Sequence, residues 1–169
     1  MTPEEHLAAA LAGLGFAGDP EMARTPELVA RLLAEFLPVA PPPLEPLDTL
    51  GGDLVIMRDL PFHSLCAHHL LPFFGTVTLA YRPQGRIAGL GALARLVEHL
   101  ARRPQLQERL AASVADTLLD GLGAASVGVT VTARQLCVEM RGARVPATFE
   151  VVATRGAADP ELRAALRAR

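Results

Sequence analysis

The proline-rich segment at residues 38–47, PVAPPPLEPL, is the feature that most limits how this chain can fold. Proline fixes its own φ angle and lacks an amide hydrogen, so such a run forms neither a helix nor a central strand. We therefore expect an extended linker at these residues. It should join a small N-terminal helical extension, residues 1–47 with the linker included, to a larger domain at residues 48–169.

Two helices are predicted before the linker. Thr2, Pro3 and Glu5 form a capping-box arrangement for a helix over about residues 3–14. A second helix should begin at Thr25 and end before the linker, because apolar residues recur there at helical spacing.

After the linker the hydrophobic period changes, and β-rich segments flank two helical ones. The predicted elements are strands at 53–58 and 75–82, helices at 91–102 and 104–121, strands at 125–133, 136–140 and 147–154, and a helix near 159–168. This ββααββ order predicts an α+β domain, an antiparallel sheet with two helices on one face.

Composition excludes several classes of protein. The formal net charge of the 169 residues is -2, and no block of like charges marks a nucleic-acid-binding face or a membrane anchor. The N-terminus lacks the basic residues of a signal peptide, and no apolar run reaches about 18 residues. We expect a cytoplasmic protein with a small-molecule partner.

The segment Cys66-Ala67-His68-His69 places a thiol and two imidazoles close together. Cysteines of cytoplasmic proteins are more often thiols or metal ligands than disulfides, and Zn²⁺ prefers thiolate and imidazole ligands. Cys66, His69 and the later Cys137 therefore predict a zinc site with a fourth position open to water, and His68 as a proton carrier. Fe²⁺ also suits such a site. Alternatively, both cysteines are ordinary buried side chains and the histidines are satisfied polar groups.

At these residues the chain resembles the GTP cyclohydrolase I family, and the similarity covers about residues 19–142. Four segments follow the family's order and spacing: CAHHLLPF at 66–73, GLGALAR at 89–95, RPQLQERL at 103–110 and QLCVEMRG at 135–142. The resemblance implies a T-fold, a Zn²⁺ ion on Cys66, His69 and Cys137, and sites between neighbouring subunits of pentameric rings that stack into a decamer. It also implies hydrolysis of GTP to formate and 7,8-dihydroneopterin triphosphate in folate and pterin biosynthesis. The expected partner is therefore GTP or a related purine nucleotide.

The same resemblance assigns the remaining site residues. His68 corresponds to the family's proton-transfer residue near the imidazole ring of guanine, and Gln135 occupies the position of its second catalytic histidine. Substrate contacts are implied for Glu108 as the guanine anchor, Gln107 beside it, and Arg95, Arg141 and Arg31 at the triphosphate.

The chain departs from the family at four positions, Ala67, Gly91, Ala92 and Gln135. Glutamine cannot act as a general acid or base near neutral pH, so Gln135 affects the chemistry most. His63 is a candidate replacement for the lost proton carrier. Other interpretations are a divergent paralogue that stops at ring opening or uses another purine nucleotide, and a non-catalytic subunit of a mixed oligomer.

Overall fold

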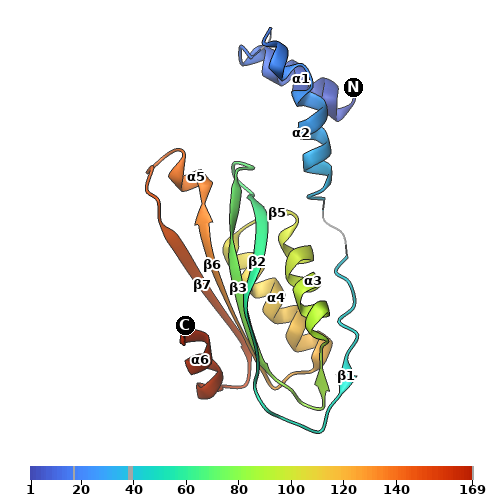
Figure 1. The fold of residues 1–169 in the computed structure, drawn as a ribbon, viewed down its shortest axis with the longest axis vertical. Helices are drawn as coiled ribbons and strands as arrows, with labels where there is room; N and C mark the ends of the chain where they lie inside the picture. Colours follow the sequence, from blue (N-terminus) through green and yellow to red (C-terminus); the bar gives the residue numbers. More distant parts are fainter. Residues whose placement is uncertain (17, 38–39, 169) are drawn as a thin grey trace. The chain divides into compact units, whose positions relative to one another are not determined.

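A computed structural model describes residues 1–16, 18–37 and 40–168 (Figure 1). The chain forms two compact units, residues 1–37 and 38–169. Pro38 and Val39, at the start of the predicted linker, lie outside the described residues, and residues 40–46 form no helix or strand. Leu44 is buried, 6% exposed, in the core of the second unit. The division at residue 47 stays a prediction.

The N-terminal unit contains α1 (Pro3–Gly13), a short 3₁₀ helix (Pro20–Met22) and α2 (Thr25–Ala34). The predicted capping box is present: the Glu5 amide donates to Thr2 Oγ1 at 3.2 Å, and the Thr2 amide donates to Glu5 Oε2 at 2.8 Å. Thr2 and Glu5 thus satisfy amides that the first helical turn leaves unpaired. Both helices predicted for this unit are confirmed.

The second unit is built on a five-stranded sheet in the order β5-β2-β3-β6-β7. All its neighbouring strands are antiparallel except the short β2–β5 pair, which is parallel. The elements are β1 (Leu47–Asp48), β2 (Val55–Cys66), β3 (Pro72–Arg82), β4 (Arg86–Ile87), α3 (Leu90–Ala101), β5 (Pro104–Gln105), α4 (Gln107–Leu122), β6 (Ser126–Gln135), α5 (Leu136–Glu139), β7 (Thr148–Gly156) and α6 (Pro160–Arg167).

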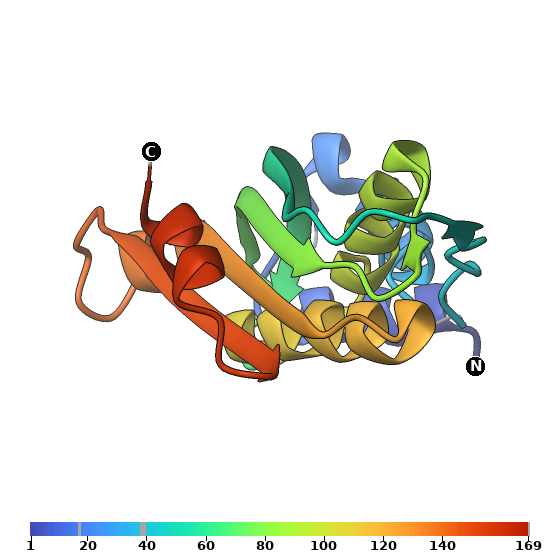
Figure 2. The ribbon, with the colours of Figure 1, turned by 90° about the horizontal axis from the view of Figure 1, so that it is seen from below.

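Helices α3 and α4 cover one face of the sheet, and α6 lies on the other (Figures 1 and 2). Alternation along β3 explains the two faces, because side chains on a strand point to opposite sides in turn. Val77, Leu79 and Tyr81 are fully buried in the core, whereas Thr76 and Thr78 border the polar hollow beside α6. The predicted ββααββ arrangement is confirmed. Among the described residues, no helix is long and apolar enough to cross a membrane.

The strand predicted at residues 136–140 is wrong, because the chain forms the short helix α5 there. The Met140 amide donates to the Leu136 carbonyl at 2.9 Å, and Arg134 pairs with Glu139 across the turn. Five residues are too few for the apolar pattern to exclude one helical turn. As a result, Cys137 lies on a helix beyond the end of β6 rather than in a strand.

Asp159 caps α6 and joins it to the sheet. Its carboxylate accepts hydrogen bonds from Arg82 Nε at 2.7 Å, the Ser126 hydroxyl at 2.9 Å and the Leu162 amide at 3.0 Å. These donors, Arg82 foremost, hold the pKa of Asp159 well below its usual range.

Asp159→Ala should lower the free energy of unfolding by about 1–2 kcal/mol at pH 7, a typical cost of losing a helix N-cap. The folded pKa of Asp159 lies below its unfolded value of about 4, so the stabilisation is complete above that pH and disappears as the pH falls towards the folded pKa. Urea unfolding at pH 7 and pH 3 measures this. Glu161→Ala, at an exposed partner of Arg82, is the control and should have little effect. An equal loss for Asp159→Ala at both pH values would contradict the role given to the ionised carboxylate.

Candidate metal centre

The first two candidate ligands lie on the turn between β2 and β3. The Cys66 carbonyl accepts from the Leu70 amide at 2.8 Å, the Cys66 amide donates to the Leu71 carbonyl at 2.8 Å, and Leu70 adopts a left-handed φ of 54°. The Ala67 amide also donates to the Gln105 carbonyl of β5 at 3.0 Å. This tight turn brings the Cys66 and His69 side chains together, with Cys66 Sγ 3.8 Å from His69 Nδ1.

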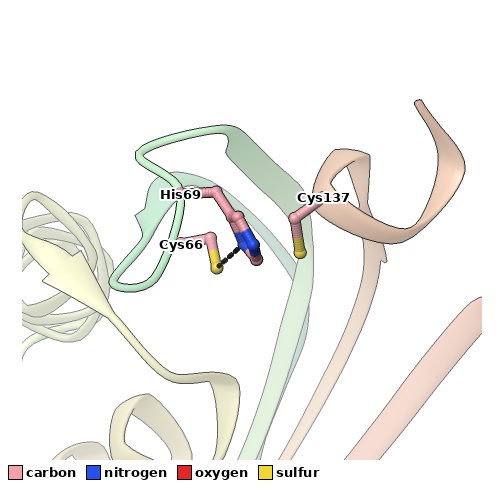
Figure 3. A group of neighbouring side chains, drawn as sticks. All are labelled: Cys66, His69 and Cys137. Atoms are coloured by element: carbon pink, nitrogen blue, oxygen red, sulfur yellow. Dashed lines mark hydrogen bonds between the residues drawn. The ribbon is translucent and has the colours of Figure 1, made fainter. Parts of the chain in front are cut away.

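The third candidate ligand reaches the turn through the sheet register. Strand β6 pairs with β3 so that Gln135 lies opposite Phe73, next to the β2–β3 turn, and α5 then carries Cys137 towards it. Ligand atoms of Cys66, His69 and Cys137 all lie within 4.8 Å of one another (Figure 3). The cluster predicted from the sequence is therefore assembled from two segments that are distant along the chain.

The chemistry of this cluster fits a divalent cation. Cys66 is buried, Cys137 is half-buried and His69 is exposed, so one side of the cluster remains open. Burial raises the pKa of the Cys137 thiol, and the neighbouring Cys66 raises it further. A bound cation offsets both effects because it stabilises thiolates. Two sulfurs and an imidazole are the ligands that Zn²⁺ prefers.

A row of side-chain contacts runs from Cys137 to Gln135 and on to Gln107. The Gln135 carbonyl oxygen lies 3.9 Å from Cys137 Sγ, and the Gln135 amide nitrogen donates to Gln107 Oε1 at 2.8 Å. Gln107 is only 4% exposed, and its own nitrogen donates to backbone carbonyls. Sequence reasoning placed Gln107 among the substrate contacts and missed this contact with Gln135. The two residues are far apart in the sequence, and no local pattern links them.

Two further predicted residues border the cluster. Arg141 contacts Nε2 of His69 through its guanidinium group, which places a positive charge beside the imidazole. His68 is exposed on the turn, and its ring lies edge-on to that of His69 with centroids 6.1 Å apart. An imidazole and a guanidinium group therefore adjoin the open side of the cluster.

The other predicted substrate contacts lie on three helices. Glu108 is exposed in the first turn of α4, where the helix dipole also favours a carboxylate. Arg95 is exposed on α3. Arg31 lies on α2 in the N-terminal unit and pairs with Glu27 at 3.3 Å. Arg141 thus contacts the cluster within the second unit, and Arg31 belongs to the N-terminal unit.

Two of the departures from the family's motifs lie on α3. Ala92 is buried, 6% exposed, so a longer polar side chain at this position would have to extend out of the core. A Cβ atom added to Gly91 would lie 3.2 Å from the guanidinium group of Arg95, so this arginine occupies the space beside position 91. Ala67, by contrast, is exposed on the turn.

His63 does not reach the cluster. It pairs with Phe74 on β3 and stacks on that ring at 5.9 Å, whereas Gln135 lies opposite Phe73. Adjacent residues of a strand face opposite sides of the sheet, so His63 and Gln135 lie on different faces. The structure therefore offers no support for His63 as a replacement proton carrier.

The arrangement of strands and helices in the second unit is the T-fold. A solved structure of the archaeosine synthase QueF-Like in the apo form shares it with a TM-score of 0.53 and 22% identity, covering 64% of this chain and 99% of that chain. The sequence model of GTP cyclohydrolase I matches residues 4–168. The chain belongs to the GTP cyclohydrolase I family of enzymes.

Individual relatives agree with this assignment. GTP cyclohydrolase 1 of Aquifex aeolicus (strain VF5) is 43% identical over 144 residues, which cover 83% of this chain and 78% of that protein. The protein of the same name from Geobacillus kaustophilus (strain HTA426) is 43% identical over 139 residues, 78% of this chain and 74% of that protein. For the Streptococcus sanguinis (strain SK36) protein, also named GTP cyclohydrolase 1, identity is 47% over 119 residues, 69% of this chain but only 65% of the relative.

Proposed function

We propose that this chain is a Zn²⁺-dependent cyclohydrolase that opens the imidazole ring of guanine in GTP and releases formate. The observation that carries this proposal is the Cys66–His69–Cys137 cluster, open on one side, with a histidine and an arginine next to it. When bound, the ion would lower the pKa of a water molecule towards neutrality and so supply a nucleophile. Relatives named GTP cyclohydrolase 1 support GTP as the substrate.

The chain's own residues would bind the nucleotide and move protons. The carboxylate of Glu108 can accept hydrogen bonds from the N1–H and the 2-amino group of guanine, which discriminates against bases that lack them. His68 would transfer protons at the imidazole ring of the base. Positive charge for the triphosphate would come from Arg141, Arg95 and Arg31. Gln107, the residue before Glu108, would be a further substrate contact.

We also propose a product, an oligomeric state and a cellular compartment for this chain. The complete reaction yields 7,8-dihydroneopterin triphosphate for folate and pterin biosynthesis. The chain would act in the cytoplasm as a homo-oligomer, a decamer of two pentameric rings. Sites between subunits would let residues of one chain contact a substrate held by a neighbour.

A second candidate is an enzyme that stops after ring opening. The observation that favours it is the state of Gln135, whose nitrogen is bonded to Gln107 and whose oxygen faces Cys137. This side chain cannot supply the proton that the later ribose rearrangement needs. Ring opening, by contrast, depends on the cluster and His68.

We expect the zinc-loaded protein to release formate from GTP and to form a pterin that becomes fluorescent on oxidation. Formate and fluorescence are measured in parallel, with metal-stripped protein as the control. Formate without a fluorescent pterin would establish the second candidate instead of the first. If a panel of purine nucleotides yields no formate, both candidates fail and the non-catalytic subunit is favoured; it should then co-purify with an active relative.

A further inference from the structure

The polar hollow beside α6 has a volume of about 540 Å³ and is bordered by five threonines of the sheet. Four of them form two pairs directly across neighbouring strands: Thr76 lies opposite Thr132, and Thr78 lies opposite Thr130. Directly paired residues share one face of a sheet, so these hydroxyl-bearing side chains stand next to one another. Thr148 on β7 is the fifth. The hollow is therefore lined by groups that both donate and accept hydrogen bonds.

The hydroxyl of Thr130 is the group in the hollow that points to a ligand. Thr130 is only 6% exposed, and among the described residues its Oγ1 atom has no hydrogen-bond partner. A buried hydroxyl without a partner costs stability, and buried polar side-chain atoms are nearly always paired. Valine has the same shape, suits a strand and would avoid this cost. A polar partner that enters the hollow would offset it for threonine.

The charges around the hollow indicate the kind of ligand. Arg58 and Arg167 border it together with Asp59 and Glu150, so positive and negative charges are equal in number. An ion of either sign would meet like charges as well as opposite ones. A neutral molecule with several hydroxyl groups can instead donate to the carboxylates, accept from the guanidinium groups and do both with the threonines.

We propose that the polar hollow binds a neutral, polyhydroxylated small molecule of the size of a monosaccharide. Its volume lies within the range of about 300–1,000 Å³ that is typical of small-molecule sites, and one water molecule occupies only about 30 Å³. Most such sites are mainly apolar, with a few polar groups. A lining that is mainly polar requires an occupant that can pair many polar atoms at once, because unpaired ones are costly to bury.

This site is separate from the metal cluster. Three residues along β6 separate Thr132 from Gln135, so the two side chains lie on opposite faces of the sheet. The proposed binding therefore does not depend on the metal ion or on GTP.

The test is saturation-transfer difference NMR on the full-length protein, without nucleotide or added metal, with D-glucose as the probe. Glucose should receive saturation from the protein, whereas tetrahydropyran, which has the same ring without hydroxyl groups, should not. Thr130→Val should weaken glucose binding by roughly three- to tenfold, the change expected for one neutral hydrogen bond. Thr130→Ser keeps the hydroxyl and should stay within about twofold of the original affinity.

Thr117→Val is the matched control. Thr117 lies on α4, which covers the opposite face of the sheet, and its hydroxyl donates to the Ser113 carbonyl at 2.8 Å. Its glucose affinity should be unchanged. Thermal unfolding without glucose completes the comparison: Thr130→Val should have a Tm no lower than that of the original chain, because the hydroxyl that it removes has no partner within the described fold.

The proposal would be overturned by an absence of saturation transfer to glucose, by equal transfer to tetrahydropyran, or by equal weakening in Thr117→Val. A lower Tm in Thr130→Val would also contradict it, since the hydroxyl would then have a partner within the fold. Stronger binding of glucuronate than of glucose would assign the hollow to an anion instead. Formate release from GTP is measured independently, so failure of the proposed activity and failure of this site are distinguishable.

Discussion

Cys137→Ala should reduce the affinity for Zn²⁺ by on the order of a hundredfold to a thousandfold and bring formate release below detection. Structural zinc sites with four protein ligands obtain about 10–16 kcal/mol from binding, so each ligand contributes several kcal/mol. Cys137 is one of three ligands in this cluster and the only one contributed from beyond β6. Competition with a chromophoric chelator measures the affinity, and formate is assayed on the same samples.

Val138→Ala is the control for this substitution. Val138 is the next residue of α5, is half-buried and has no donor atom in its side chain. Truncating the Val138 side chain to alanine should leave the affinity for Zn²⁺ within a few-fold of that of the unsubstituted chain. Unchanged zinc binding in Cys137→Ala, with circular dichroism showing a folded protein, would mean that the ion is held by other residues.

Gly75→Ala should cost about 3 kcal/mol of folding free energy, the upper end of the usual penalty for overpacking. A Cβ atom at this position would lie 2.0 Å from the Thr132 carbonyl oxygen and 2.8 Å from the Ala133 Cα atom. Both are backbone atoms of β6, so no side chain can move aside and the strands must separate. Thermal unfolding at fixed protein concentration should show a Tm lower by roughly 6–12 °C.

The same substitution should also weaken the metal site. Gly75 lies two residues from Phe73, whose pairing with Gln135 delivers Cys137 to the turn. Gly52→Ala is the control, since a Cβ there meets nothing within 4 Å and the residue lies outside the sheet. Equal melting temperatures for Gly75→Ala and Gly52→Ala would show that β3 and β6 can separate at this point without loss.

Local patterns predicted most of the secondary structure. The capping box at Thr2 and the helical spacing after Thr25 need only a few neighbouring residues, and the structure confirms both helices. Prediction failed where a segment was short. Residues 136–140 are apolar enough for a short strand, but one turn of helix suits them equally well, and the pairing of β6 with β3 ends before them. Strand β2 also runs on to Cys66, well beyond its predicted end at Arg58.

The metal cluster was predictable because its chemistry is visible in the residue types. A Cys-x-x-His turn and a second cysteine suit Zn²⁺ wherever the chain brings them together. The positions of the residues around the cluster were not predictable in the same way. His63 seemed available in the sequence, yet the register with β3 places it on the opposite face from Gln135. Gln107 stays a predicted substrate contact, and its hydrogen bonds to the backbone and to Gln135 could not be read from the sequence.

The sequence by itself determined which residues can bind a cation, where the helices begin, and that the chain lacks the histidine of its family at position 135. Those properties follow from side-chain chemistry and from contacts within a few residues. Tertiary structure alone decided which way the Gln135 amide points, because that depends on Gln107, whose nitrogen donates to the carbonyls of Val131 and Phe149, far along the chain. Long-range register thus placed the Gln135 oxygen where it accepts from the Cys137 thiol.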